Sequence, residues 1–103
     1  MGQPKFETIK EKFDWAKAAA KARLREAHKM TAGDAIEVMS DPTFRSYLQK
    51  EVAYQEEYAK RAGVGKVAHV LEGLLTVAGE TAADLYVKRM KDGKSAQPSP
   101  APA

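Results

Sequence analysis

The sequence predicts a small all-α protein, a helical bundle or long helical hairpin with three main helices, a short connector helix and a disordered C-terminal tail. Three observations lead to this fold class. Apolar residues recur at alternating spacings of three and four, which is the period of an amphipathic helix. Helix-capping residues stand where these stretches begin. Most of the 5 prolines and 7 glycines lie between or beyond the stretches.

The first stretch runs from Pro4 to Lys29 without an interior glycine or proline. Proline is favoured at the first position of a helix, so we expect this helix to begin at Pro4. A run of alanines in its middle would let a neighbouring helix approach closely. Its apolar face consists of Phe6, Ile9, Phe13, Ala16, Ala20, Leu24 and Ala27.

Two capping signals divide the middle of the chain. Thr31 followed by Asp34 predicts the start of a short connector helix that ends near Met39. Asp41-Pro42 joins a capping acceptor to a favoured first helical residue, and it predicts a helix from Pro42 to Ala62. The apolar face of that helix consists of Phe44, Tyr47, Leu48, Val52, Gln55, Tyr58, Ala59 and Ala62.

A glycine-rich break at residues 63–65, with Gly63 as the expected helix cap, predicts a tight turn between antiparallel helices. The final helix is predicted from Val64 or Lys66 to Lys91, ended by Gly93. It is apolar on more than one side, so other helices must cover it. We therefore expect one domain over residues 1–92 and a flexible proline- and alanine-rich tail over residues 93–103.

Composition excludes several classes of function. The chain has no cysteine, which rules out disulfides and cysteine-ligated metals. Every long apolar window carries charged residues, so no transmembrane segment is expected. No apolar leader follows the first lysine, and we expect a cytoplasmic protein or one held within an assembled particle.

The first 30 residues carry the basic excess of a chain whose net charge is +3. Lys17, Lys21 and Arg25 follow at spacings of four, so they form a basic ridge on one helix face that could track phosphates. The simpler interpretation is a solvated face, because no known DNA-binding motif accompanies the ridge. Trp15 could stack on a base, although a half-buried structural role suits it better.

No pattern indicates catalysis. His69 and Glu72 reverse the Glu-x-x-His spacing of helical metal sites, and an interhelical hydrogen bond is the simpler interpretation. Residues 63–66 lack the spacing of a phosphate-binding loop. We therefore expect no catalytic residue, no metal and no cofactor.

The features that remain favour helix–helix assembly. The helix from Pro42 to Ala62 is rich in tyrosine, a residue common at interfaces. Core packing of Tyr47 and Tyr58, with Tyr54 simply exposed, explains the pattern equally well. Glycines inside the last helix cost about 1 kcal/mol each relative to alanine, which indicates that another backbone comes close. The interface candidates are Tyr47, Tyr54, Tyr58, Val70, Gly73, Val77 and Gly79.

The leading hypothesis is a non-enzymatic interaction protein that forms a homo-oligomer or binds a protein partner. It would act as a subunit, adaptor or small structural or accessory component, for example of a virion such as a phage or of a mobile element. One alternative is a nucleic-acid-binding module that uses the basic ridge. Another is a membrane-surface protein that lays Phe6, Ile9 and Phe13 on anionic lipid.

Overall fold

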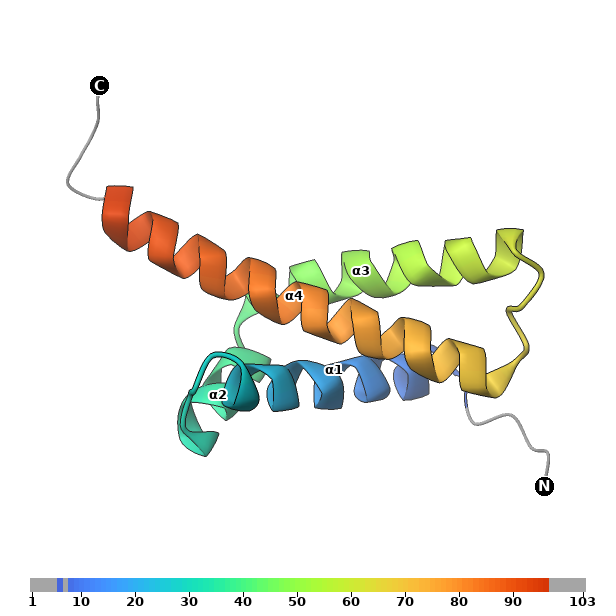
Figure 1. Cartoon of the computed structure of the whole chain (residues 1–103), viewed down its shortest axis with the longest axis horizontal. Helices are drawn as coiled ribbons and strands as arrows, with labels where there is room; N and C mark the ends of the chain where they lie inside the picture. Colours follow the sequence, from blue (N-terminus) through green and yellow to red (C-terminus); the bar gives the residue numbers. More distant parts are fainter. Residues whose placement is uncertain (1–5, 7, 97–103) are drawn as a thin grey trace.

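The computed structural model describes residues 6 and 8–96, and it confirms the all-α fold class (Figure 1). The helices are α1 (Ile9–Glu26), α2 (Ala32–Met39), α3 (Pro42–Arg61) and α4 (Ala68–Ala96). The molecule is elongated, with extents of 54 × 30 × 21 Å. Its radius of gyration of 15.5 Å exceeds the roughly 13 Å of a compact chain of this length.

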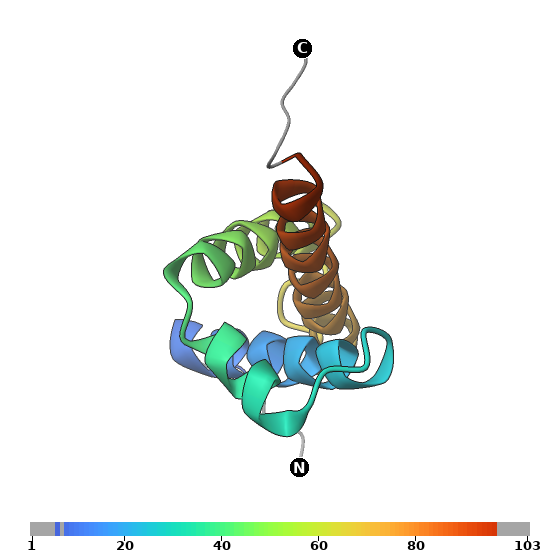
Figure 2. The same ribbon diagram turned by 90° about the vertical axis from the view of Figure 1, so that its left-hand side faces the viewer.

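The longest helix, α4, is the centre of the bundle. It packs mainly against α1 and α3, and α2 lies beside the C-terminal half of α1 (Figure 1). Seen from the end, α1, α3 and α4 form a triangle, and no described helix covers the side of α4 that points away from the other two (Figure 2). One side of the central helix is therefore left open.

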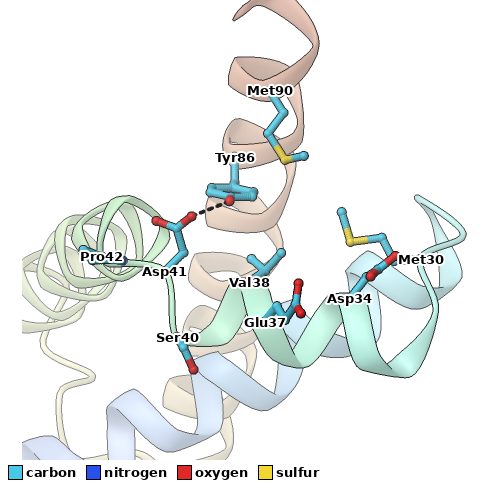
Figure 3. Close-up of a pocket in the computed structure, with 9 residues that line it drawn as sticks. All are labelled: Met30, Asp34, Glu37, Val38, Ser40, Asp41, Pro42, Tyr86 and Met90. Carbon is cyan, nitrogen blue, oxygen red and sulfur yellow. Dashed lines mark hydrogen bonds between the residues drawn. The ribbon is translucent and has the colours of Figure 1, made fainter. Parts of the chain in front are cut away.

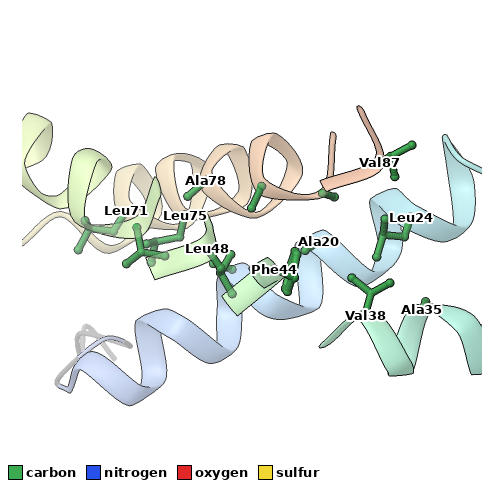
Figure 4. Close-up of a cluster of buried hydrophobic side chains, with 14 of the residues drawn as sticks. Ala20, Leu24, Ala35, Val38, Phe44, Leu48, Leu71, Leu75, Ala78 and Val87 are labelled. Carbon is green, nitrogen blue, oxygen red and sulfur yellow. The ribbon is translucent and has the colours of Figure 1, made fainter. Parts of the chain in front are cut away.

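The core lies where α4 meets α1 and α3, and α2 adds Ala35 and Val38 to it (Figure 4). Its largest fully buried side chains are Leu24, Phe44, Leu48 and Leu75. Small residues, such as Ala16 and Ala20 of α1, fill the rest of the α1–α4 contact. The alanine run was expected to allow close helix approach, and here it does.

The first helix begins later than Pro4. Thr8 is its N-cap, and a capping box joins the Thr8 side chain to the backbone N–H of Glu11 and the Glu11 side chain to the backbone N–H of Thr8. Two otherwise unsatisfied donors are paired in this way, which fixes the start at Ile9. Phe6 lies before the helix, and Pro4 is outside the described residues.

The predicted starts of α2 and α3 are confirmed. The Thr31 hydroxyl accepts from the backbone N–H of Asp34 at 3.1 Å, and the Asp41 carboxylate accepts from the backbone N–H of Thr43 at 2.8 Å. At the end of α3, Gly63 has φ of 75°, a left-handed conformation that glycine adopts without strain. Local chemistry alone sets these boundaries.

Both ends of the last helix differ from the prediction. Turns continue after Gly63 up to Val67, so α4 starts at Ala68. Gly93 does not end the helix, which continues to Ala96. The first four residues of the tail predicted over residues 93–103 therefore belong to α4, and residues 97–103 lie outside the described residues. None of the described helices is long and apolar enough to cross a membrane.

Candidate interaction surfaces around α4

The closest helix crossing joins α1 to α4 at Gly79. A Cβ atom added there would collide with the carbonyl oxygen of Ala16 and lie 3.0 Å from the backbone nitrogen of Ala20. The close backbone approach predicted for this glycine is therefore present, but within one chain. Gly79 is buried and cannot form a contact between chains. It was predicted as an interface candidate, and the structure removes it from that set.

Trp15 ties the same two helices together. Its indole N–H lies 3.1 Å from the backbone oxygen of Glu72 and 3.0 Å from the hydroxyl oxygen of Thr76. The ring is half-buried, and the edge of Phe6 packs against it with centroids 5.5 Å apart. The structural role expected for this tryptophan is confirmed.

A second tie joins the end of α1 to α4 through Asp84. Arg23 donates two hydrogen bonds to the Asp84 carboxylate, at 3.0 and 2.9 Å, and His28 Nε2 lies 2.7 Å from Asp84 Oδ1. The Arg23 hydrogen bond, followed by that of His28, holds the pKa of Asp84 below its usual value despite partial burial. One carboxylate thus fixes two segments of the N-terminal part, and no spacing in the sequence signals this cluster.

The uncovered side of α4 carries an uncharged apolar strip, which we call the outer stripe. Its members follow at helical spacings of three and four, so they share one side of the helix. Val77 is 46% exposed, Gly73 is exposed, and the other three are half-buried. The outer stripe consists of Val70, Gly73, Leu74, Val77 and Thr81.

Gly73 and Gly79 have opposite surroundings. A Cβ atom added at Gly73 would meet nothing within 4 Å, whereas Gly79 is enclosed by α1. Packing among residues 6 and 8–96 therefore accounts for Gly79 but not for Gly73. Of the predicted interface residues on the last helix, Val70, Gly73 and Val77 are brought together on one accessible surface.

The tyrosines of α3 separate into two groups. Tyr47 is half-buried and packs against the core, whereas Tyr54 and Tyr58 are 66% and 53% exposed. Tyr58 was expected on the apolar face of this helix, but it lies at its edge. Of the three, Tyr54 and Tyr58 are therefore mainly accessible to a partner and Tyr47 is not.

The basic ridge is only partly free. Lys21 and Arg25 are exposed on α1, and neither has an ion pair among the described residues. Lys17 is half-buried, with its ammonium 5.9 Å from the centroid of the Phe13 ring. The ridge therefore offers two accessible cations instead of three.

The residues considered for metal or lipid binding do not form either kind of site among the described residues. His69 is exposed at the start of α4, and the part of the chain that the structure describes holds no group of three potential metal ligands. Phe6 and Phe13 pack against the core, which leaves Ile9 exposed by itself at the N-terminal end of α1.

Sequence reasoning missed a groove between α2 and the C-terminal half of α4 (Figure 3). Its volume is about 490 Å³, and the thioethers of Met30 and Met90 point into it. A second hollow of about 330 Å³ adjoins it and shares both methionines. We call the first hollow the Met–acid groove and define it by Met30, Asp34, Glu37, Asp41, Tyr86 and Met90.

One wall of this groove is a fixed polar pair. The Tyr86 hydroxyl donates to Asp41 Oδ2 at 2.6 Å, and the Tyr86 ring packs edge-on against Phe44. The hydrogen bond to Asp41, with burial, raises the pKa of Tyr86 to about 12. The same bond lowers the pKa of Asp41, so this carboxylate stays ionised while it caps α3.

Comparison with protein-family models, with curated proteins and with solved structures gave no significant match to this chain.

Proposed function

We propose that this protein is a non-enzymatic assembly component that pairs with a second copy of itself through the outer stripe of α4. The observation that carries the proposal is Gly73. A glycine inside a helix costs about 1 kcal/mol relative to alanine, and no contact among the described residues offsets that cost here. A partner helix packed over Gly73 would offset this cost.

The neighbours of Gly73 support a helix as the partner. Val70 and Val77 lie one turn to either side of it, and both are apolar and accessible. Small residues at the centre of a helix contact allow close approach, as Gly79 does within this chain. A stripe that is uncharged along its whole length is also complementary to itself, as a two-fold symmetric dimer requires.

Light scattering coupled to size exclusion tests the proposal, with Val77→Glu compared to Ile36→Glu. Ile36 is 52% exposed on α2, so the control adds the same charge at a similarly exposed apolar site away from the stripe. We expect the parent chain and the control to be dimers at high salt and Val77→Glu to be a monomer. A parent chain that is monomeric at high concentration would contradict self-association.

A second candidate function is nucleic-acid binding through Lys21 and Arg25, which are exposed one turn apart without ion-pair partners among the described residues. It predicts binding that weakens steeply with salt and is lost when Lys17, Lys21 and Arg25 become glutamate. Filter binding with single- and double-stranded DNA at two salt concentrations measures it. Binding that does not respond to salt, or no binding, would contradict this candidate.

A further inference from the structure

We infer that the Met–acid groove is a docking site for a cationic amphipathic helix supplied by another polypeptide. The groove lies on a different side of α4 from the outer stripe, because Tyr86 and Met90 are offset around the helix from Val70 and Val77. The inference therefore stands apart from self-association.

The charges of the groove point to a cationic ligand. Its three charged lining residues, Asp34, Glu37 and Asp41, are all acidic, although the chain as a whole carries a net charge of +3. Within the described residues, neither Asp34 nor Glu37 has an ion-pair partner. Carboxylates of one sign at the rim attract and orient a ligand of the opposite sign.

The floor of the groove points to an apolar anchor. Met90 is 41% exposed, and the thioethers of Met30 and Met90 face the space between α2 and α4 (Figure 3). Methionine is flexible and polarisable, so a methionine-lined surface adapts to the shape of an inserted side chain. Because the adjoining hollow shares both methionines, the apolar floor extends past the acidic rim toward Val87, and it ends beside His28 and Lys91.

Together these features select a helix with apolar residues on one side and lysine or arginine on the other. An amphipathic helix binds in a groove by inserting apolar side chains at spacings of three and four, and its flanking charges set its position. A cation without an apolar side would leave the methionines exposed. A metal ion lacks its ligands here, since the described residues hold no group of three close enough to bind one.

The probe is a synthetic amphipathic helix of leucine and lysine, added to the full chain labelled on its methionine methyl groups. The chain has only 4 methionines, so each methyl signal in an NMR spectrum can be assigned by substitution. We expect the methyl signals of Met30 and Met90 to shift strongly and that of Met39, which does not line the groove, to shift little. Two further probes are the same peptide with glutamate in place of lysine and the polyamine spermine.

Matched variants separate docking from general attraction between charges. Asp34→Asn with Glu37→Gln should weaken binding roughly tenfold, because two rim charges are lost. Glu51→Gln with Glu57→Gln on α3 makes the same change in net charge and should leave binding unchanged. Met90→Gln keeps every charge but removes an anchor, so it should also weaken binding, and its exposed position spares the fold.

The outcomes are decisive in both directions. The inference is supported if only the lysine peptide shifts Met30 and Met90, and if the groove variants weaken binding while the α3 variant does not. It is overturned if the peptide shifts neither methionine, if the glutamate peptide binds equally well, or if spermine produces the same shifts. Equal weakening by both charge variants would likewise exclude a specific site.

Discussion

At the scale of single residues, the two interior glycines of α4 allow a paired test. Gly79→Ala places a methyl group against the backbone of Ala16, and forced overpacking of this kind costs about 1 to 3 kcal/mol of unfolding free energy. Gly73→Ala meets open space, so its gain in helix propensity should stabilise the folded chain by about 0.5 to 1 kcal/mol.

Chemical denaturation, run at a concentration low enough to keep the chain monomeric, measures both effects. If the two variants changed stability in the same direction, the α1–α4 crossing at Gly79 would not be as close as described. The two variants carry the same substitution in the same helix, so a difference in their stability reports the difference in packing around Gly73 and Gly79.

Tyr86 makes a second prediction at this scale. Its folded pKa of about 12 lies above the usual value of 10.0, because Asp41 accepts its proton in a hydrogen bond. The stability from this pair is therefore complete below pH 10 and is lost as the pH rises through the folded pKa. Tyrosinate absorbance, compared between the parent chain and Tyr86→Phe, should identify a group that ionises near pH 12.

Asp41→Asn is the control for that titration. Asparagine keeps the helix cap of α3 but removes the negative charge beside the phenol. The pKa of Tyr86 should then fall toward its usual value. An unchanged titration curve would mean that burial, and not Asp41, sets the shift.

At the scale of helices, Asp84 couples α1 to α4, and its effect depends on pH. Its pKa is lowered in the folded chain, so its contribution is present above the ordinary carboxylate range and is lost as pH falls through the folded pKa. We expect Asp84→Asn to destabilise the chain at neutral pH, and the difference from the parent chain to shrink in acid. Urea denaturation across acidic and neutral pH measures this.

Helix boundaries could be predicted where the signal is local. Thr31 and Asp41 each cap a helix with their own side chains, and both starts were predicted correctly. The start of α1 was placed too early because Pro4 is a favourable first residue, while the reciprocal bonds of Thr8 and Glu11 lie four residues further on. Gly93 was taken as a helix end, although a glycine ends a helix only when the chain turns there.

At the scale of the whole molecule, the surfaces differ in how far the sequence could reveal them. Val70, Gly73 and Val77 belong to one helix, so their common side follows from spacing alone. The Met–acid groove combines Met30, the acidic residues of α2 and the distant Met90. They come together only because α2 packs against α1 and α3, the same helices that pack against α4. Likewise, Arg23 and His28 reach Asp84 only after folding.

The last prediction concerns the stability of the assembled protein. If α4 pairs with a second copy, association stabilises the folded state by mass action, so Tm should rise with protein concentration. Val77→Glu should abolish this concentration dependence, whereas Ile36→Glu should keep it. Scanning calorimetry over a hundredfold range of concentration measures the effect. A dimer formed only by folded chains must shift the unfolding equilibrium as it is diluted. A parent Tm that does not change over that range would therefore mean that the chain does not self-associate through the surface around Gly73.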